Sequence, residues 1–276
     1  MDTVARVLGQ SLTDKLKQAV IVENRPGAGG SIGTQYVRQQ TEDENVALLT
    51  TASFVAAPLL NPGAKYDPVS DFQPICGIFD SFAFVIANGS VPANSLSEFI
   101  EFAKSSEHPI EAGTPGPSGG SHVVSLYLAK RAGFEILPIP YKGNADMELG
   151  VVSGDVKMII TTLSPSILSH VKEGRLKILG VSSRERLPSL PDIATVSESV
   201  PDFYVDGWGG LYAPLNVDSR RLTQVARAVE SAIKDQQFRE LMESLMFTQK
   251  FYTGVEFRQA TKRLYEAYKL MLRETG

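Results

Sequence analysis

The chain has 276 residues, of which 43% are apolar, and a formal net charge of −4 at pH 7. This length suits two domains or one large one, and the apolar share is enough to bury a core. The charge balance argues against nucleic acid as a partner, because nucleic acid requires a basic face. The single cysteine excludes an intrachain disulfide, and no stretch of about 18 apolar residues is present to span a bilayer.

Short apolar strands are predicted to alternate with helices along the chain. Residues 2–16 carry apolar side chains at helical spacing, which predicts an amphipathic helix rather than a secretory signal peptide. Further helices are expected at 31–39, 96–105, after the glycine-rich loop at 113–122, and at 146–153, 164–173, 219–235 and 254–274. Strands are expected at 19–23, 46–50, 72–79 with 82–87, 110–112, 136–140, 156–161, 176–182 and 203–212.

Repeated strand–helix units predict an α/β fold with mainly parallel sheets and helices on both faces. Two strand regions are long and interrupted, near residues 79–82 and 206–210. We expect each to cross from one domain to the other, so that residues 81–207 form one domain and the two ends of the chain form the second. A cleft between two domains is a common place for a ligand site.

The glycine-rich loop at 113–122 (GTPGPSGGSH) runs directly into an apolar helical pattern. A helix start carries unpaired N–H groups and the positive end of the helix dipole, so it attracts anions. Glycines allow a ligand to approach the backbone closely, and Ser121 is a suitable N-cap. The loop therefore predicts a pocket for a carboxylate or phosphate, although an ordinary strand-to-helix turn would have the same pattern.

Hydroxyl side chains follow two of the predicted strands. Thr51 and Ser53 come after the strand at 46–50, and Thr161 and Thr162 stand at the end of the strand at 156–161. The carboxyl ends of strands in open α/β sheets are a usual ligand position. These residues are candidates for ligand contact, with an ordinary strand-to-loop turn as the alternative in each case.

The sequence offers little from which to build a catalytic site. The chain has three histidines, one cysteine and no clustered pair of acids, which disfavours a catalytic triad or a metal site. The glycine-rich loop also lacks the lysine of a P-loop. The sequence therefore predicts a protein that is not an enzyme and that uses no cofactor and no metal.

Several strings occur in order over nearly the whole chain: VENRPGAGGSIG at 22–33, YDP and DF within 66–72, PYKG at 140–143, GRLK at 174–177, LPDIATV at 190–196 and WGGLYAP at 208–214. Together they resemble signatures of the extracytoplasmic solute receptors of tripartite tricarboxylate transporters, also called Bug receptors. The resemblance implies a type II periplasmic binding protein fold, in which two α/β lobes close over a ligand. Lobe 1 would consist of residues 1–80 with 208–276, and lobe 2 of residues 81–207.

The resemblance also implies a function. A small carboxylate would be held in the inter-lobe cleft by backbone amides, hydroxyls and ordered waters, and then presented to a membrane permease. The protein would be periplasmic and a monomer, without nucleic acid as a partner. A ligand-sensing partner of a membrane sensor protein is the alternative. The ligand-binding residues implied are Thr51, Ser53, Thr114, Ser118, Gly119, Gly120, Ser121, His122, Thr161 and Thr162.

The chain departs from the family pattern at two places. Many relatives carry an Asp-Asn pair where Thr161 and Thr162 stand, so we expect a ligand that requires no amino group. Family members also begin with a strand and a Pro/Gly-rich loop before a helix of the form Asp-x-x-Ala-Arg. Residues 2–6 match that helix directly after Met1, so lobe 1 is expected to lack its first strand. Either the sequence is shortened, or the chain is a homologue that has lost transport.

Overall fold

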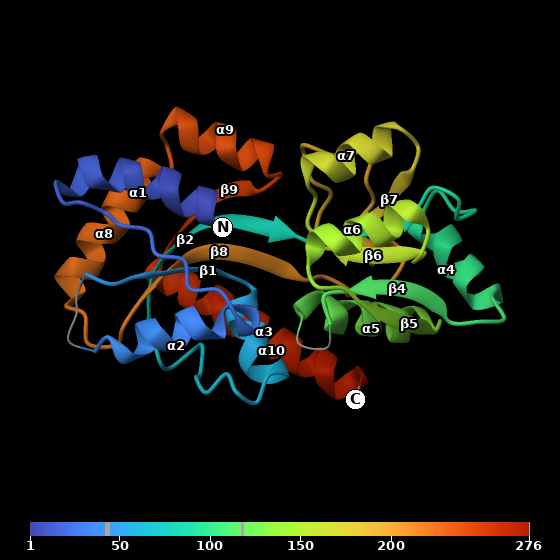
Figure 1. The fold of residues 1–276 in the computed structure, drawn as a ribbon, viewed down its shortest axis with the longest axis horizontal. Helices are drawn as coiled ribbons and strands as arrows, with labels where there is room; N and C mark the ends of the chain where they lie inside the picture. The colour runs from blue at the N-terminus through green and yellow to red at the C-terminus, as the bar shows by residue number, and fades with distance from the viewer. Residues whose placement is uncertain (42–44, 117–118, 276) are drawn as a thin grey trace. The chain divides into compact units, whose positions relative to one another are not determined.

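The chain folds into two compact units, shown in a computed structural model that describes residues 1–41, 45–116 and 119–275 (Figure 1). Unit 1 comprises Met1–Ser81 and Gly207–Glu266, and unit 2 comprises Phe82–Asp206 and Ala267–Gly276. The sequence-based division placed all of residues 208–276 in one lobe, whereas the last turns of the C-terminal helix α10 (Gly254–Thr275) group with unit 2.

Unit 1 is built on a four-stranded sheet with the order β1-β8-β2-β9. Its strands are β1 (Leu48–Thr51), β2 (Gln73–Phe82), β8 (Asp206–Ala213) and β9 (Thr248–Thr253). The pairs β1–β8 and β2–β9 are antiparallel. Its other helices are α1 (Asp2–Leu16), α2 (Ser31–Gln39), α3 (Ser53–Leu60), α8 (Ser219–Ala232) and α9 (Gln236–Ser244), with the 3₁₀ turn η1 (Ala28–Gly30) before α2.

Side chains of β8 alternate between two cores in unit 1, as the period of a strand requires. Leu211 and Ala213 join an aliphatic cluster formed with α1, α8 and α9. Trp208 and Tyr212 join an aromatic cluster, in which the Tyr212 ring stacks on Phe54 at 4.5 Å between centroids. In Figure 1, α1 and α9 accordingly lie on one side of the strands and α2 lies on the other.

Unit 2 contains a five-stranded sheet with the order β5-β4-β6-β3-β7. Its strands are β3 (Phe84–Asn88), β4 (Ile110–Thr114), β5 (Ile136–Pro140), β6 (Met158–Thr161) and β7 (Leu176–Val181). β4 runs parallel to β5 and β6, whereas β3 runs antiparallel to β6 and β7. In unit 2, β3 alone runs against the other four strands, so the expectation of a mainly parallel sheet describes the strand directions there, although both pairs that β3 forms are antiparallel. In unit 1, the antiparallel pairs β1–β8 and β2–β9 do not fit that expectation.

The helices of unit 2 are α4 (Leu96–Ser105), α5 (Gly120–Ala132), α6 (Asn144–Ser153) and α7 (Pro165–Lys172), with the 3₁₀ turn η2 (Val196–Glu198). In Figure 1, α6 and α7 lie above β4 and β6, and α5 lies below them. The bounds of α4 match the sequence prediction, because Ser95 caps the helix by accepting a hydrogen bond from the Glu98 N–H.

Two further local predictions are wrong, and one helix was not predicted. Residues 19–23 form no strand, since their backbone pairs with no other strand among the described residues. Helix α3 was not predicted, because it is apolar on all sides and contains Pro58. Ser121 is not an N-cap, because α5 begins one residue earlier and its N-cap is Gly119.

Candidate functional site

The carboxyl ends of β4 and β6 lie at the same edge of the unit 2 sheet, because the two strands are parallel neighbours. This edge therefore brings together Thr114, which ends β4, with Thr161, which ends β6, and Thr162 directly after it. Thr114 is 1% exposed and Thr161 is 8% exposed, whereas Thr162 is exposed. The structure thus gathers three of the predicted hydroxyls at one strand edge.

The glycine-rich loop connects this edge to α5, a helix of 13 residues. Gly119 caps the helix in an extended conformation, and its N–H donates to the Gly116 carbonyl at 3.0 Å. A Cβ on Gly119 would lie 2.3 Å from Pro115 Cγ, so the loop requires glycine here. Among the described residues, no side chain caps the start of α5, which leaves the first N–H groups of the helix available to an anion. The predicted residue Ser118 lies outside the described residues.

Gly120 packs against the end of α10 within unit 2. A Cβ on Gly120 would lie 2.6 Å from the Tyr268 hydroxyl oxygen, and Tyr268 is 5% exposed. Any side chain at this position would therefore disturb packing as well as ligand access. Ser121 follows in the first turn, and its carbonyl accepts a hydrogen bond from the Ser125 hydroxyl at 2.8 Å. The N–H groups of the loop, more than its side chains, are the groups suited to an anion.

His122 links the loop back to β4. Its Nδ1 lies 3.4 Å from Thr114 Oγ1, a long contact whose donor depends on the tautomer. Burial lowers the pKa of His122, because a buried imidazolium loses hydration, so the ring is neutral at pH 7. A neutral imidazole carries one donor and one acceptor. His122 can thus orient Thr114 or donate one hydrogen bond, and it adds no charge at this pH.

A cation also stands near this edge. The Tyr141 N–H donates to the Thr114 carbonyl at 2.8 Å, which places the PYKG turn beside the end of β4. Lys142 follows Tyr141 directly, and its side chain is exposed. The sequence alone does not bring Lys142 to the end of β4, because this contact links strands that the α5 helix separates.

Unit 1 has its own cluster of polar groups at a strand end. β1 ends at Thr51, whose hydroxyl lies 3.4 Å from that of Ser53, and α3 begins there without a side-chain cap. The turn at η1 lies against this point, since a Cβ on Gly30 would be 3.9 Å from Ser53 Oγ. Gly29 and Gly30 have φ of 66° and 91°, a region that favours glycine. These glycines are not among the ligand-binding residues that the resemblance implies, although their glycine pattern was the available signal.

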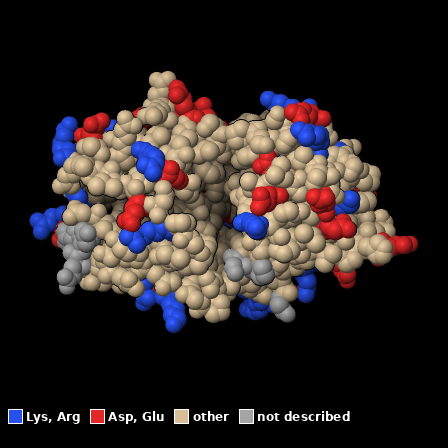
Figure 2. All heavy atoms as spheres, in the orientation of Figure 1, with Lys and Arg blue, Asp and Glu red and all other residues tan. Residues whose placement is uncertain are grey.

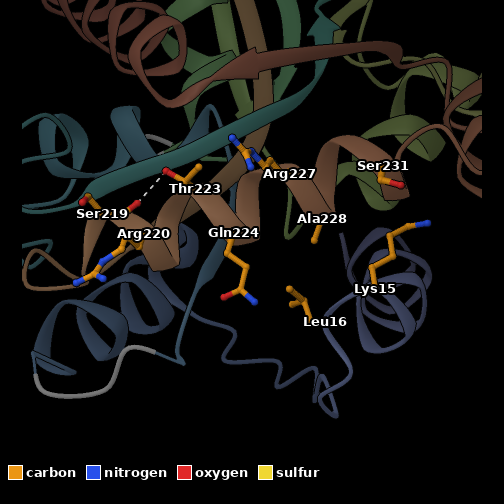
Figure 3. A pocket seen from close by; sticks show the side chains of 9 residues that line it. All are labelled: Lys15, Leu16, Ser219, Arg220, Thr223, Gln224, Arg227, Ala228 and Ser231. Carbon is orange, nitrogen blue, oxygen red and sulfur yellow. Dashed lines mark hydrogen bonds between the residues drawn. The ribbon is translucent and has the colours of Figure 1, made fainter.

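A different cavity of about 590 Å³ lies between α1 and α8 (Figure 3). It is lined by Lys15 of α1 and by polar residues of α8 that include Arg220 and Thr223. Two of its cations are already engaged: Lys15 pairs with Asp235 at 3.3 Å, and Arg220 lies 3.5 Å from Asp218. This cavity contains none of the predicted site residues.

The face of the molecule drawn in Figure 2 has no large area of one charge. Figure 2 shows acidic and basic side chains interspersed on the visible face. Among the residues that the structure describes, no group of three or more His, Cys, Asp or Glu side chains could hold a metal ion. Within the same described ranges, no helix has both the length and the apolar character needed to cross a membrane. Anion binding would therefore depend on local N–H and hydroxyl groups.

Comparison with known proteins identifies relatives over the whole chain. The family model described as the tripartite tricarboxylate transporter family receptor matches residues 4–261. Protein BugT of Bordetella pertussis is 28% identical in an alignment that covers 100% of this chain and 85% of BugT. The solved periplasmic binding protein BugD is 29% identical with a TM-score of 0.83, and the match covers 100% of this chain and 93% of that one.

More distant solved structures share the fold. MatC from Rhodopseudomonas palustris, solved with bound malate, has a TM-score of 0.81 at 23% identity and covers 98% of this chain and 93% of its own. Another protein from that organism, solved with adipate, has a TM-score of 0.86 at 22% identity and covers 100% of this chain and 92% of its own. The two-lobed α/β fold expected from the sequence is confirmed by these matches.

Proposed function

Because the chain belongs to the tripartite tricarboxylate transporter receptor family, we propose that it captures a small organic carboxylate for a membrane permease of that transporter class. Members of the family are periplasmic solute-binding receptors rather than enzymes. On this proposal the protein acts in the periplasm as a monomer and releases its ligand chemically unchanged. The ligand class follows from relatives of the same fold, which hold malate and adipate.

The observation that carries the proposal is the uncapped start of α5. The Gly119 N–H already donates to the Gly116 carbonyl, so the N–H groups offered to a ligand are those of Gly120 and Ser121, beside the strand edge that holds Thr114 and Thr161. A carboxylate accepts such N–H and O–H donors in short, charge-assisted hydrogen bonds, and the helix dipole favours its charge. The exposed Lys142 adds positive charge near this edge.

The uncapped start of α3 offers a second set of donors within unit 1. Thr51 and Ser53 provide hydroxyls there, and Gly29 and Gly30 leave the backbone of η1 open to close approach. Both strand ends supply neutral donors without a carboxylate side chain among the residues named. Neutral donors of this kind suit a ligand that binds through its carboxylate groups. No group in either set would require an amino group on the ligand.

Isothermal titration with malate, adipate and citrate tests the proposal on the intact chain. We expect at least one of these acids to bind in the titration. In a thermal melt, the same acid at about 100 times its Kd should raise the melting temperature by several degrees, because that excess stabilises the folded state by ~2.7 kcal/mol. The variant Gly119→Ala should weaken binding at least tenfold, because its methyl group would overlap the Pro115 ring and displace the loop.

Gly143→Ala is the matched control for this variant. Gly143 lies after the neighbouring strand, has φ of 175°, and has no atom within 4 Å of the position of an added Cβ. The Gly143→Ala variant should bind each acid with the same affinity as the unchanged chain. If Gly119→Ala and Gly143→Ala bind every acid equally well, the α5 loop does not form the site. Unchanged melting in all three acids would contradict the receptor function itself.

The permease partner is tested separately. Membranes that contain a tripartite tricarboxylate permease should retain the ligand-loaded protein more strongly than the ligand-free protein. Equal retention in both states, with normal acid binding in solution, would contradict delivery to a permease and favour a receptor read by another membrane protein.

A further inference from the structure

The α1–α8 cavity of unit 1 is lined by cations without a carboxylate. Nine residues line it, of which Lys15, Arg220 and Arg227 are basic and none is acidic. The whole chain carries 31 acidic and 27 basic side chains, so this local excess of positive charge does not follow from composition. The cavity also contains none of the candidate residues for carboxylate binding, so the proposed ligand site does not account for its charge.

The arginines of the cavity are available to a partner. Arg227 is exposed, and among the described residues its guanidinium has no hydrogen bond or ion pair. Arg220 lies 3.5 Å from Asp218, but its side chain is 94% exposed, and an ion pair so open to water contributes little and is readily exchanged for another. Lys15 is held in place by Asp235 and adds a fixed cation.

Gln224 adds neutral donors between the two arginines of α8. Its Oε1 accepts a hydrogen bond from Arg221 Nη1 at 3.0 Å, which leaves the N–H groups of Nε2 without a partner in the described part of the chain. In Figure 3, the Gln224 side chain extends from α8 toward the side on which Leu16 lies. A lining that consists mainly of donors complements a ligand that is rich in acceptors, such as carboxylates and backbone carbonyls.

The spacing of the two arginines indicates the form of the ligand. Arg220 and Arg227 lie seven residues apart on α8, which is just under two turns and about 10 Å along the helix axis. A polyproline II segment places side chains three residues apart on one face, roughly 9 Å from each other. The spacing therefore fits an extended segment with two acidic residues three positions apart better than it fits a single small anion.

We propose that the α1–α8 cavity docks an extended acidic segment of the membrane partner. Two carboxylates of the segment pair with Arg220 and Arg227, and a carbonyl between them accepts from Gln224. The identity of the partner as a permease rests on the proposed function, whereas the chemistry of docking does not. Charged pairs at a surface speed association more than they raise affinity, which suits a receptor that docks and leaves in every transport cycle.

Two peptide isomers test the docking chemistry on the intact chain by fluorescence anisotropy. The first is Gly-Ser-Glu-Pro-Pro-Glu-Ser-Gly, whose prolines favour the extended form, and the second is Gly-Ser-Pro-Glu-Glu-Pro-Ser-Gly. We expect the first to bind at least about fivefold more tightly in about 50 mM salt, and the difference to shrink in about 500 mM salt, because salt screens exposed charges. Equal affinity of the two isomers in low salt, or binding of neither, would overturn the proposal.

Arg227→Gln tests the location of the docking site, and Arg263→Gln is its matched control. Arg263 is an exposed arginine of α10 in unit 1 that lines no part of the cavity, and its substitution changes the net charge equally. Arg227→Gln should weaken the spaced peptide at least about fivefold, because it removes a charge-assisted pair, and the control should leave its affinity unchanged. Equal effects of the two variants would overturn the location.

A second copy of the chain is the other possible occupant of the cavity. Dimers of the unchanged chain that Arg227→Gln abolishes, measured by sedimentation velocity, would assign the cavity to that second copy and overturn the proposal.

Binding of malate and adipate separates this proposal from the receptor function. Arg227→Gln should bind these acids as the unchanged chain does, while membranes that contain the permease retain it less strongly than Arg263→Gln. Equal retention of the two variants would overturn the permease as the docking partner. Absence of acid binding to the unchanged chain, with the peptide preference intact, would contradict the receptor function and still support the docking site.

Discussion

The outer strands of the two sheets differ in how their unpaired edges are protected. In unit 2, the N–H of Tyr141 and the carbonyl of Glu135 face β4, so the alternate residues of β5 face outward. Two of those outward residues are Pro138 and Pro140, which have no N–H to donate. In unit 1, the outer strand β1 contains no proline and borders an apolar groove.

The other edge of the unit 2 sheet is also covered. The Val181 N–H of β7 donates to the Ala194 carbonyl at 3.0 Å, and Thr195 forms a bridge with Val181. A capping box between Thr195 and Glu198 fixes this covering segment. Proteins commonly protect sheet edges by such devices, because unpaired edges recruit other strands. The contrast is that both edges of the unit 2 sheet are protected, whereas β1 of unit 1 borders an apolar groove.

The largest expected effect is the difference in stability loss between a proline placed in a paired strand and a proline placed in an unpaired segment. Ile159→Pro removes a ladder donor from β6, which pairs on both sides, and should cost more than about 3 kcal/mol. Ile21→Pro affects a segment that pairs with no strand and should cost less than about 1 kcal/mol. Thermal melts of the two variants check this difference, which corresponds to roughly 6–12 °C for 3 kcal/mol in a domain of this size.

Similar losses of melting temperature in both variants would mean that residues 19–24 are paired in solution. That outcome would remove the contrast between the two sheets.

A second variant opens the closed edge of unit 2. The double substitution Pro138→Val and Pro140→Val restores two outward N–H donors on β5, and Val is favourable in strands. We expect self-association that rises with protein concentration, measured by sedimentation velocity, while the unchanged chain stays monomeric. A monomeric double variant at the same concentrations would show that the prolines do not protect this edge.

The smallest expected effect concerns the segment at residues 194–198, which protects the edge of β7. Arg186 and the Thr195 N–H stabilise the Glu198 carboxylate and lower its pKa from 4.5 to about 2. A folded-state pKa below the unfolded value adds stability that is present above pH 4.5 and lost as the pH falls toward 2. Glu198→Gln should therefore cost less than about 1 kcal/mol at pH 7, since the ion pair is exposed, and nothing near pH 2. Melting temperatures across this pH range provide the check, and a difference that does not shrink in acid would contradict it.

Local signals explain which parts of the fold the sequence could predict. The bounds of α4 and β5 agree with prediction. For α4 the signal is local, because the Ser95 side chain caps the helix by accepting a hydrogen bond from the Glu98 N–H. Strand direction could not be predicted in the same way, since β3 and β8 pair with segments far along the chain. Residues 19–23 have the composition of a strand, but a strand also requires a partner for its backbone.

In the candidate site, too, features set by local sequence could be predicted and features set by long-range packing could not. Thr161 could be inferred from an apolar run followed by hydroxyls, and Thr114 from the glycine-rich loop. The structure places both at one edge of the sheet. The packing of Gly120 against Tyr268 could not be inferred, because the two residues lie on helices distant in sequence. The closeness of Gly30 to Ser53 could not be inferred for a related reason, because it arises only when η1 packs on α3.

The most direct test of the proposed receptor function combines ligand binding with its location. Amide exchange is measured on the unchanged chain with and without saturating adipate, and again with malate. The account predicts slower exchange at the described loop residues 119–122 with at least one acid, and unchanged exchange at the α1–α8 cavity. Binding of an acid that leaves residues 119–122 unaffected would contradict the proposed site, and the absence of any change with either acid would contradict a carboxylate receptor of this kind.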